Sequence, residues 1–61
     1  MNPTDRADRL AILTDKWVTV GLRPRESQEV SRLLRAEAKK LGETVDAVTD
    51  HHLAEAMWRN A

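Results

Sequence analysis

The chain has 61 residues, with ten Lys or Arg, ten Asp or Glu, and no Cys. This length suits one small domain that buries only a modest fraction of its surface. The lack of Cys excludes disulfides and thiolate metal sites, which leaves association with a second copy as a means of stabilisation. No apolar run is long enough to span a bilayer and no signal peptide is present, so we expect a cytoplasmic protein with no membrane partner.

The charges are unevenly distributed along the chain, although the formal net charge is zero. Residues 1–42 contain nine basic and six acidic residues, whereas residues 43–61 contain one basic and four acidic residues. This asymmetry predicts one basic and one acidic face.

Residues 1–16 are expected to form an N-terminal arm or a short helix. Thr4 is suited to cap a helix, and Asp5 and Asp8 suit its positive N-terminal end. The apolar run Leu10–Leu13 is also compatible with a strand that turns into the next segment.

Residues 17–22 show the alternation of a half-buried strand. Trp17, Thr19 and Gly21 would point to one side, with the branched apolar residues between them pointing to the other. A single strand leaves its backbone N–H and C=O groups without partners. The same strand of a second copy, placed antiparallel across a two-fold axis, would satisfy them.

A helix is expected to begin at Pro24 or at a Ser27 cap and to run to Leu41. Its apolar face is Val30, Leu33, Leu34, Ala38 and Leu41, at helical spacing. Gly42 suits a left-handed C-terminal cap. The cations that lie largely off the apolar face, and that either flank DNA or form a solvated face, are Arg32, Arg35, Lys39 and Lys40.

A second helix is expected from a Thr44 cap to about Arg59. Val45, Val48, His52 and Ala56 lie on one row of it. His51 and Glu55 have the i, i+4 spacing of a pair of metal ligands, but without a metal-binding motif we expect no metal.

The order of strand, helix, glycine turn and helix over residues 17–61 resembles the ribbon-helix-helix family of dimeric DNA-binding proteins. The resemblance implies a mostly α fold with one β-strand, in an intertwined homodimer with a two-stranded antiparallel ribbon between the subunits. The implied dimer core is Val18, Val20, Leu22, Val30, Leu34, Ala38, Leu41, Val48 and Leu53.

The resemblance also implies a sequence-specific DNA-binding protein, either a transcriptional repressor or a plasmid or phage accessory factor. Its ribbon would enter the major groove of double-stranded DNA, with base contacts from Trp17, Thr19 and Gly21. The implied contacts to the DNA backbone are Lys16, Arg23, Arg25, Thr44 and Val45.

A protein-interaction module is the alternative function. An antitoxin-like or inhibitor protein on the same fold would bind a partner protein through its ribbon or its acidic second helix. No catalytic arrangement or cofactor motif is recognisable, so we expect neither enzyme activity nor a cofactor.

Overall fold

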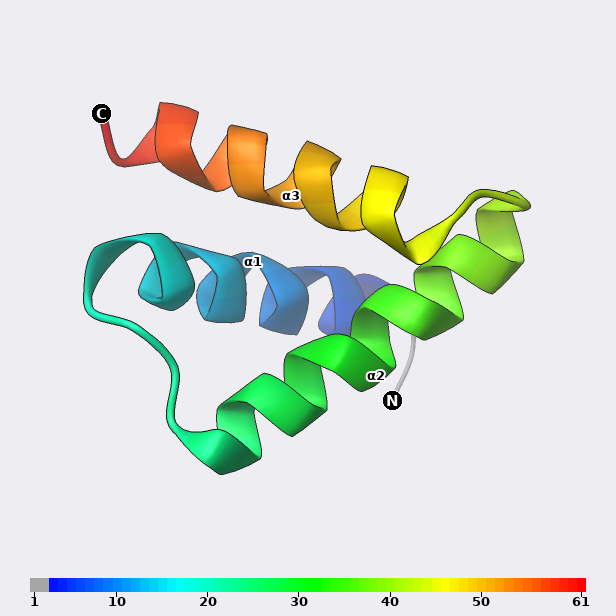
Figure 1. Ribbon diagram of the computed structural model, residues 1–61, viewed down its shortest axis with the longest axis horizontal. Helices are drawn as coiled ribbons and strands as arrows, with labels where there is room; N and C mark the ends of the chain where they lie inside the picture. Colours follow the sequence, from blue (N-terminus) through cyan, green and yellow to red (C-terminus); the bar gives the residue numbers. More distant parts are fainter. Residues whose placement is uncertain (1–2) are drawn as a thin grey trace.

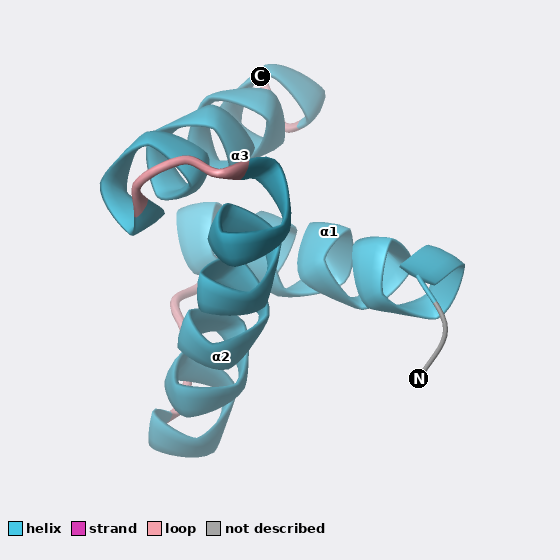
Figure 2. Ribbon diagram, turned by 90° about the vertical axis from the view of Figure 1, so that its right-hand side faces the viewer, coloured by secondary structure: helices cyan, strands magenta, loops and turns pink. Residues whose placement is uncertain are grey.

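The computed structural model describes residues 3–61, which form three helices joined by two short turns (Figure 1). These are α1 (Pro3–Thr19), α2 (Pro24–Leu41) and α3 (Val45–Arg59). α1 and α3 contact each other and both run from right to left in Figure 1, whereas Figure 2 shows that they cross at a wide angle. α2 runs back from the end of α1 to the start of α3 (Figure 1). The expected domain boundary after residue 16 therefore falls within α1.

α1 forms because a helical spacing extends further along this segment than the strand alternation does. Leu10, Leu13, Thr14 and Trp17 follow one another at i, i+3, i+4 and i+7, which places them on one face of a helix. Leu10, Leu13 and Thr14 are buried. The Thr14 hydroxyl donates to the Leu10 carbonyl at 2.9 Å, so its burial leaves no unsatisfied polar group.

The predicted strand, and with it the ribbon-helix-helix fold, is wrong. Trp17 to Thr19 belong to α1, and within residues 3–61 the structure has no strand. The backbone N–H groups of Val20 and Gly21 both donate to the Lys16 carbonyl, at 3.0 and 2.9 Å. Because these backbone groups find partners within the chain, the reason for pairing two chains through a ribbon is removed.

Gly21 ends this segment with a φ of +92°, a conformation that glycine adopts at little cost. Leu22, next to it, is half-buried and packs on the core, so the turn is held in place. Arg23 is extended (φ −77°, ψ 161°), as expected before a proline, and Pro24 begins α2. The Pro24 start is thus confirmed in preference to Ser27.

The turn between α2 and α3 is as predicted. Gly42 is left-handed, with a φ of +70°, and Glu43 donates its backbone N–H to the Ala38 carbonyl at 3.0 Å. Thr44 caps α3, because its hydroxyl accepts the backbone N–H of Ala47 at 3.2 Å. Arg59 is the last residue of α3.

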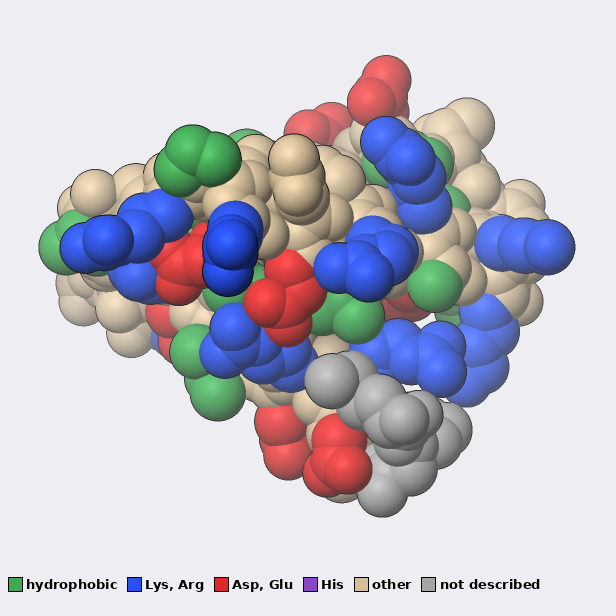
Figure 3. All heavy atoms as spheres, turned by 90° about the horizontal axis from the view of Figure 1, so that it is seen from below, with side chains coloured by type: hydrophobic (Ala, Val, Ile, Leu, Met, Phe, Trp, Pro, Cys, Tyr) green, Lys and Arg blue, Asp and Glu red, His purple; other side chains and the backbone are tan. Residues whose placement is uncertain are grey.

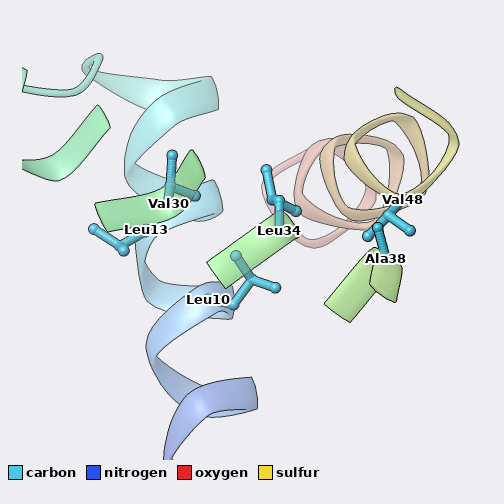
Figure 4. Close-up of a cluster of buried hydrophobic side chains, with 6 residues drawn as sticks. All are labelled: Leu10, Leu13, Val30, Leu34, Ala38 and Val48. Atoms are coloured by element: carbon cyan, nitrogen blue, oxygen red, sulfur yellow. The ribbon is translucent and has the colours of Figure 1, made fainter. Parts of the chain in front are cut away.

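All three helices contribute to the core of the single chain (Figure 4). Its buried residues are Leu10, Leu13, Val30, Leu34, Ala38 and Val48. Of the residues expected in a dimer core, Val18, Leu22 and Leu53 are half-buried, whereas Val20 (80% exposed) and Leu41 (58% exposed) face outward. Leu10 and Leu13 of α1 thus complete a core cluster within a single chain.

Ion pairs join each pair of helices. Arg9 makes two hydrogen bonds to Glu29, at 2.7 and 2.9 Å, and Lys16 binds both carboxylate oxygens of Glu26. Both of these pairs link α1 to α2. The C-terminal end of α3 is linked to α1 by Arg59 and Asp15, at 2.8 Å.

His52 and Glu37 link α3 to α2. His52 therefore has a carboxylate partner within the same chain. Among the described helices, none is long and apolar enough to cross a membrane.

We predict that Val20→Asp leaves the helical circular dichroism spectrum intact and costs about 1 kcal/mol or less, because the side chain is exposed at a helix end. Leu34→Asp should abolish folding, because it buries an unpaired carboxylate in the core. Loss of structure in the Val20 variant would mean that Val20 is buried, as it would be in the expected strand over residues 17–22.

A second prediction concerns acid. Hydrogen bonds from Lys16 and from the Arg23 backbone lower the pKa of Glu26, and the Arg9 hydrogen bonds lower the pKa of Glu29, both from an ordinary value of 4.5. The stability that these carboxylates contribute is present above pH 4.5 and is lost as the pH falls through their folded-state pKa values. The melting temperature should drop below pH 4.5, and a Glu26→Gln, Glu29→Gln variant should show a shallower drop.

Candidate nucleic-acid interface

One side of α2 carries a straight row of cations. Arg25, Gln28, Arg32, Arg35 and Lys39 follow at intervals of three, four, three and four residues, so they lie on one face of the helix. All five are exposed. We call Arg25, Arg32, Arg35 and Lys39 the basic stripe; it extends over about 21 Å of helix.

The basic stripe is turned away from the core, because Val30, Leu34 and Ala38 bury the other side of α2. Lys and Arg side chains are prominent on the side of the molecule on which α2 lies (Figure 3). A shallow polar hollow beside the stripe is lined by Ser27, Gln28, Ser31, Arg32 and Arg35. Arginine forks next to hydroxyl and amide groups are suited to oxyanions such as phosphate.

The cations of the basic stripe differ from those that stabilise the fold. Arg9, Lys16 and Arg59 each bind a carboxylate on another helix. In residues 3–61, no stripe cation forms a salt bridge, although the charge of Arg32 helps to lower the pKa of Glu29. The stripe is therefore available to an external anion.

The arrangement is unfavourable for the isolated helix. Arg32 and Arg35 are i, i+3 neighbours and Arg35 and Lys39 are i, i+4 neighbours, and like charges at these spacings cost about 0.2–0.5 kcal/mol per pair. Arg25 also lies in the first turn of α2, where the helix dipole favours anions. A bound polyanion would relieve all of these repulsions.

The residues expected to contact bases no longer share a surface. Trp17 and Thr19 are two positions apart on a helix, so they point in different directions. The Thr19 hydroxyl donates to the Asp15 carbonyl at 2.8 Å, and Gly21 shapes the turn. Without a ribbon, the geometry that would bring these three residues together in a groove is absent.

The residues expected at the DNA backbone are also dispersed. Lys16 is paired with Glu26, and Thr44 caps α3 beside an exposed Val45. Arg23 is exposed in the connection between α1 and α2. Arg25 is the one member of this set that lies on the basic stripe.

α3 is poorly suited to lie in a DNA groove. α2, a short glycine turn and α3 follow one another as in a helix-turn-helix unit, in which the second helix enters the major groove. The outer parts of α3, however, carry Asp46, Asp50 and Glu55, and its one Lys or Arg residue, Arg59, is bound to Asp15. Phosphates would repel this helix, so α2 is the better candidate interface.

The adjacent histidines of α3 are both paired with carboxylates. His51 lies 3.0 Å from Glu55 on the same helix, and His52 contacts Glu37 of α2. Over residues 3–61, no group of three or more potential ligands is placed to hold a metal ion.

Comparisons of the chain with protein-family models, with curated proteins and with solved structures gave no match.

We predict that Arg32→Gln, Arg35→Gln leaves the free energy of unfolding within about 0.5 kcal/mol of wild type, because both side chains are exposed and no core packing is lost. Arg9→Gln, which removes the pair with Glu29, should lower the free energy of unfolding. Urea denaturation of the two variants measures both effects. A large destabilisation by the stripe variant would show that these arginines serve the fold.

Proposed function

We propose that the protein binds double-stranded DNA through the phosphate backbone, with the basic stripe of α2 as the contact surface. The observation that carries the proposal is the spacing of Arg25, Arg32, Arg35 and Lys39 on one exposed face, where none of them forms a salt bridge within residues 3–61. A row of cations along a helix is a typical electrostatic footprint of nucleic-acid binding.

The stripe matches a duplex better than a single strand. Its length of about 21 Å corresponds to about six base pairs of duplex, along which phosphates recur regularly. Single-strand binding proteins use aromatic side chains on which bases stack. Both aromatic residues of this chain, Trp17 and Trp58, lie outside α2, so the stripe offers no stacking platform.

Binding of this kind is driven by the release of counterions from the DNA. Contacts to phosphates position a protein on a duplex without reading its sequence. Such a protein would act as a small accessory or regulatory factor on cytoplasmic DNA.

The test is fluorescence anisotropy with a labelled 20-base-pair duplex over a series of salt concentrations. Four phosphate contacts predict a slope of log K against log salt of about −3.6. Arg32→Gln, Arg35→Gln should weaken binding and reduce the magnitude of the slope by about 1.8, because two contacts are lost.

The matched control is Arg6→Gln, Lys40→Gln, which removes the same charge from the surface hollow that these residues line together with Leu10 and Leu33. It should retain the wild-type slope. Equal losses in the two double variants would show that net charge, not the stripe, controls binding. No binding to any duplex at low salt would contradict the proposal and favour a protein partner.

A further inference from the structure

The outward side of α3 exposes apolar side chains between its acidic residues, and within residues 3–61 no other helix covers it. α3 forms one edge of the molecule, with α1 and α2 on one side of it only (Figure 1). Its core side contributes the buried Val48 and Ala56. Its outward side exposes Met57 (59% exposed) and Trp58 (84% exposed).

Small and large side chains alternate along this face. Ala47, His51, Ala54 and Trp58 follow at i, i+4, i+7 and i+11, so they form one row, and all four are exposed. A shallow hollow lies over Ala54, bordered by His51, Trp58 and their neighbours Glu55 and Arg59.

This row is complementary to itself when reversed. The midpoint between Ala47 and Trp58 is also the midpoint between His51 and Ala54. If two α3 helices pack antiparallel across a two-fold axis at that point, each Trp58 lies over an Ala47 and each His51 lies over an Ala54. Large side chains then meet small ones along the whole contact, as close packing requires.

We propose that the outward face of α3 binds a second copy of this chain, in an antiparallel helix pair centred between His51 and Ala54. Hydrogen-bond complementarity supports this occupant, because a ring N–H of His51 can donate to a Glu55 carboxylate oxygen. His51 and Glu55 lie 3.0 Å apart within each chain, and the two-fold axis brings the two pairs together. Glu55 of one copy then lies beside His51 of the other.

The proposal does not depend on DNA binding. The stripe is on α2, and α3 alone contributes to the self-association face, so a pair of chains would leave both basic stripes exposed. Asp46 and Asp50 are exposed on the edge of α3 opposite Glu55. The surface differs from the ribbon interface expected from the sequence, which the helical structure of residues 17–19 excludes.

The test is a size exchange, measured by sedimentation equilibrium from about 1 μM to 1 mM protein. Trp58→Ala leaves Ala47 without a large partner, and Ala47→Trp places two large side chains opposite each other. Each single variant should weaken dimerisation by at least about tenfold. The double variant Ala47→Trp, Trp58→Ala restores one large and one small side chain at each contact, and its dissociation constant should return to within about threefold of wild type.

Circular dichroism of each variant checks that α3 still folds, which is expected because Ala47 and Trp58 are both exposed. Association by unspecific apolar contact would rank the variants by their number of exposed tryptophans, with Ala47→Trp the strongest. That ranking would overturn the proposal, as would a wild-type protein that stays monomeric at 1 mM. Rescue by the double variant would support it.

Discussion

The burial of one face of α1 is the interaction on which the rest of the structure depends. Leu10 and Leu13 supply two of the six residues of the main core cluster, and the Thr14 hydroxyl binds a carbonyl of its own helix, so that face is buried without a polar penalty. A chain of 61 residues has little apolar surface to bury. With α1 in place, α2 and α3 close a core without a second chain.

The same packing determines which surfaces remain free. Because α1 and α3 cover the side of α2 that contains Leu34, the basic stripe of α2 faces outward. Because α3 packs on the other helices through Val48 and Ala56, Trp58 is left in solvent. The cations that join helices are bound to carboxylates, whereas the stripe cations form no salt bridge in the described part of the chain. The arrangement of the helices therefore separates the cations that join helices from those of the basic stripe.

Much of α2 and α3 could be predicted from the sequence, because local signals agree there. The proline start, the apolar spacing from Val30 to Ala38, the Gly42 turn and the Thr44 cap each specify the same structure. Residues 17–22 carry two patterns that conflict. A short alternation suggests a strand, but the helical row that begins at Leu10 extends to Trp17 and provides backbone partners within the chain. The structure follows the longer, helical pattern, and α1 continues to Thr19.

The candidate site was only partly predictable. The sequence places Arg32, Arg35 and Lys39 off the apolar face of α2, but it groups Lys40 with them, and Arg25 was expected only as one of several contacts to the DNA backbone. The alternating intervals of three and four residues identify the stripe, and they carry this information only once α2 is known to begin at Pro24. Which cations are paired depends on contacts between helices far apart in sequence, such as Arg59 with Asp15, and no local pattern shows these.

The most direct test of the account is an assigned NMR titration with duplex DNA. We expect helical Cα shifts from residue 4 to 19 and DNA-induced changes along Arg25, Arg32, Arg35 and Lys39. Strand-like shifts at residues 17–22, with the DNA-induced changes centred there, would contradict it.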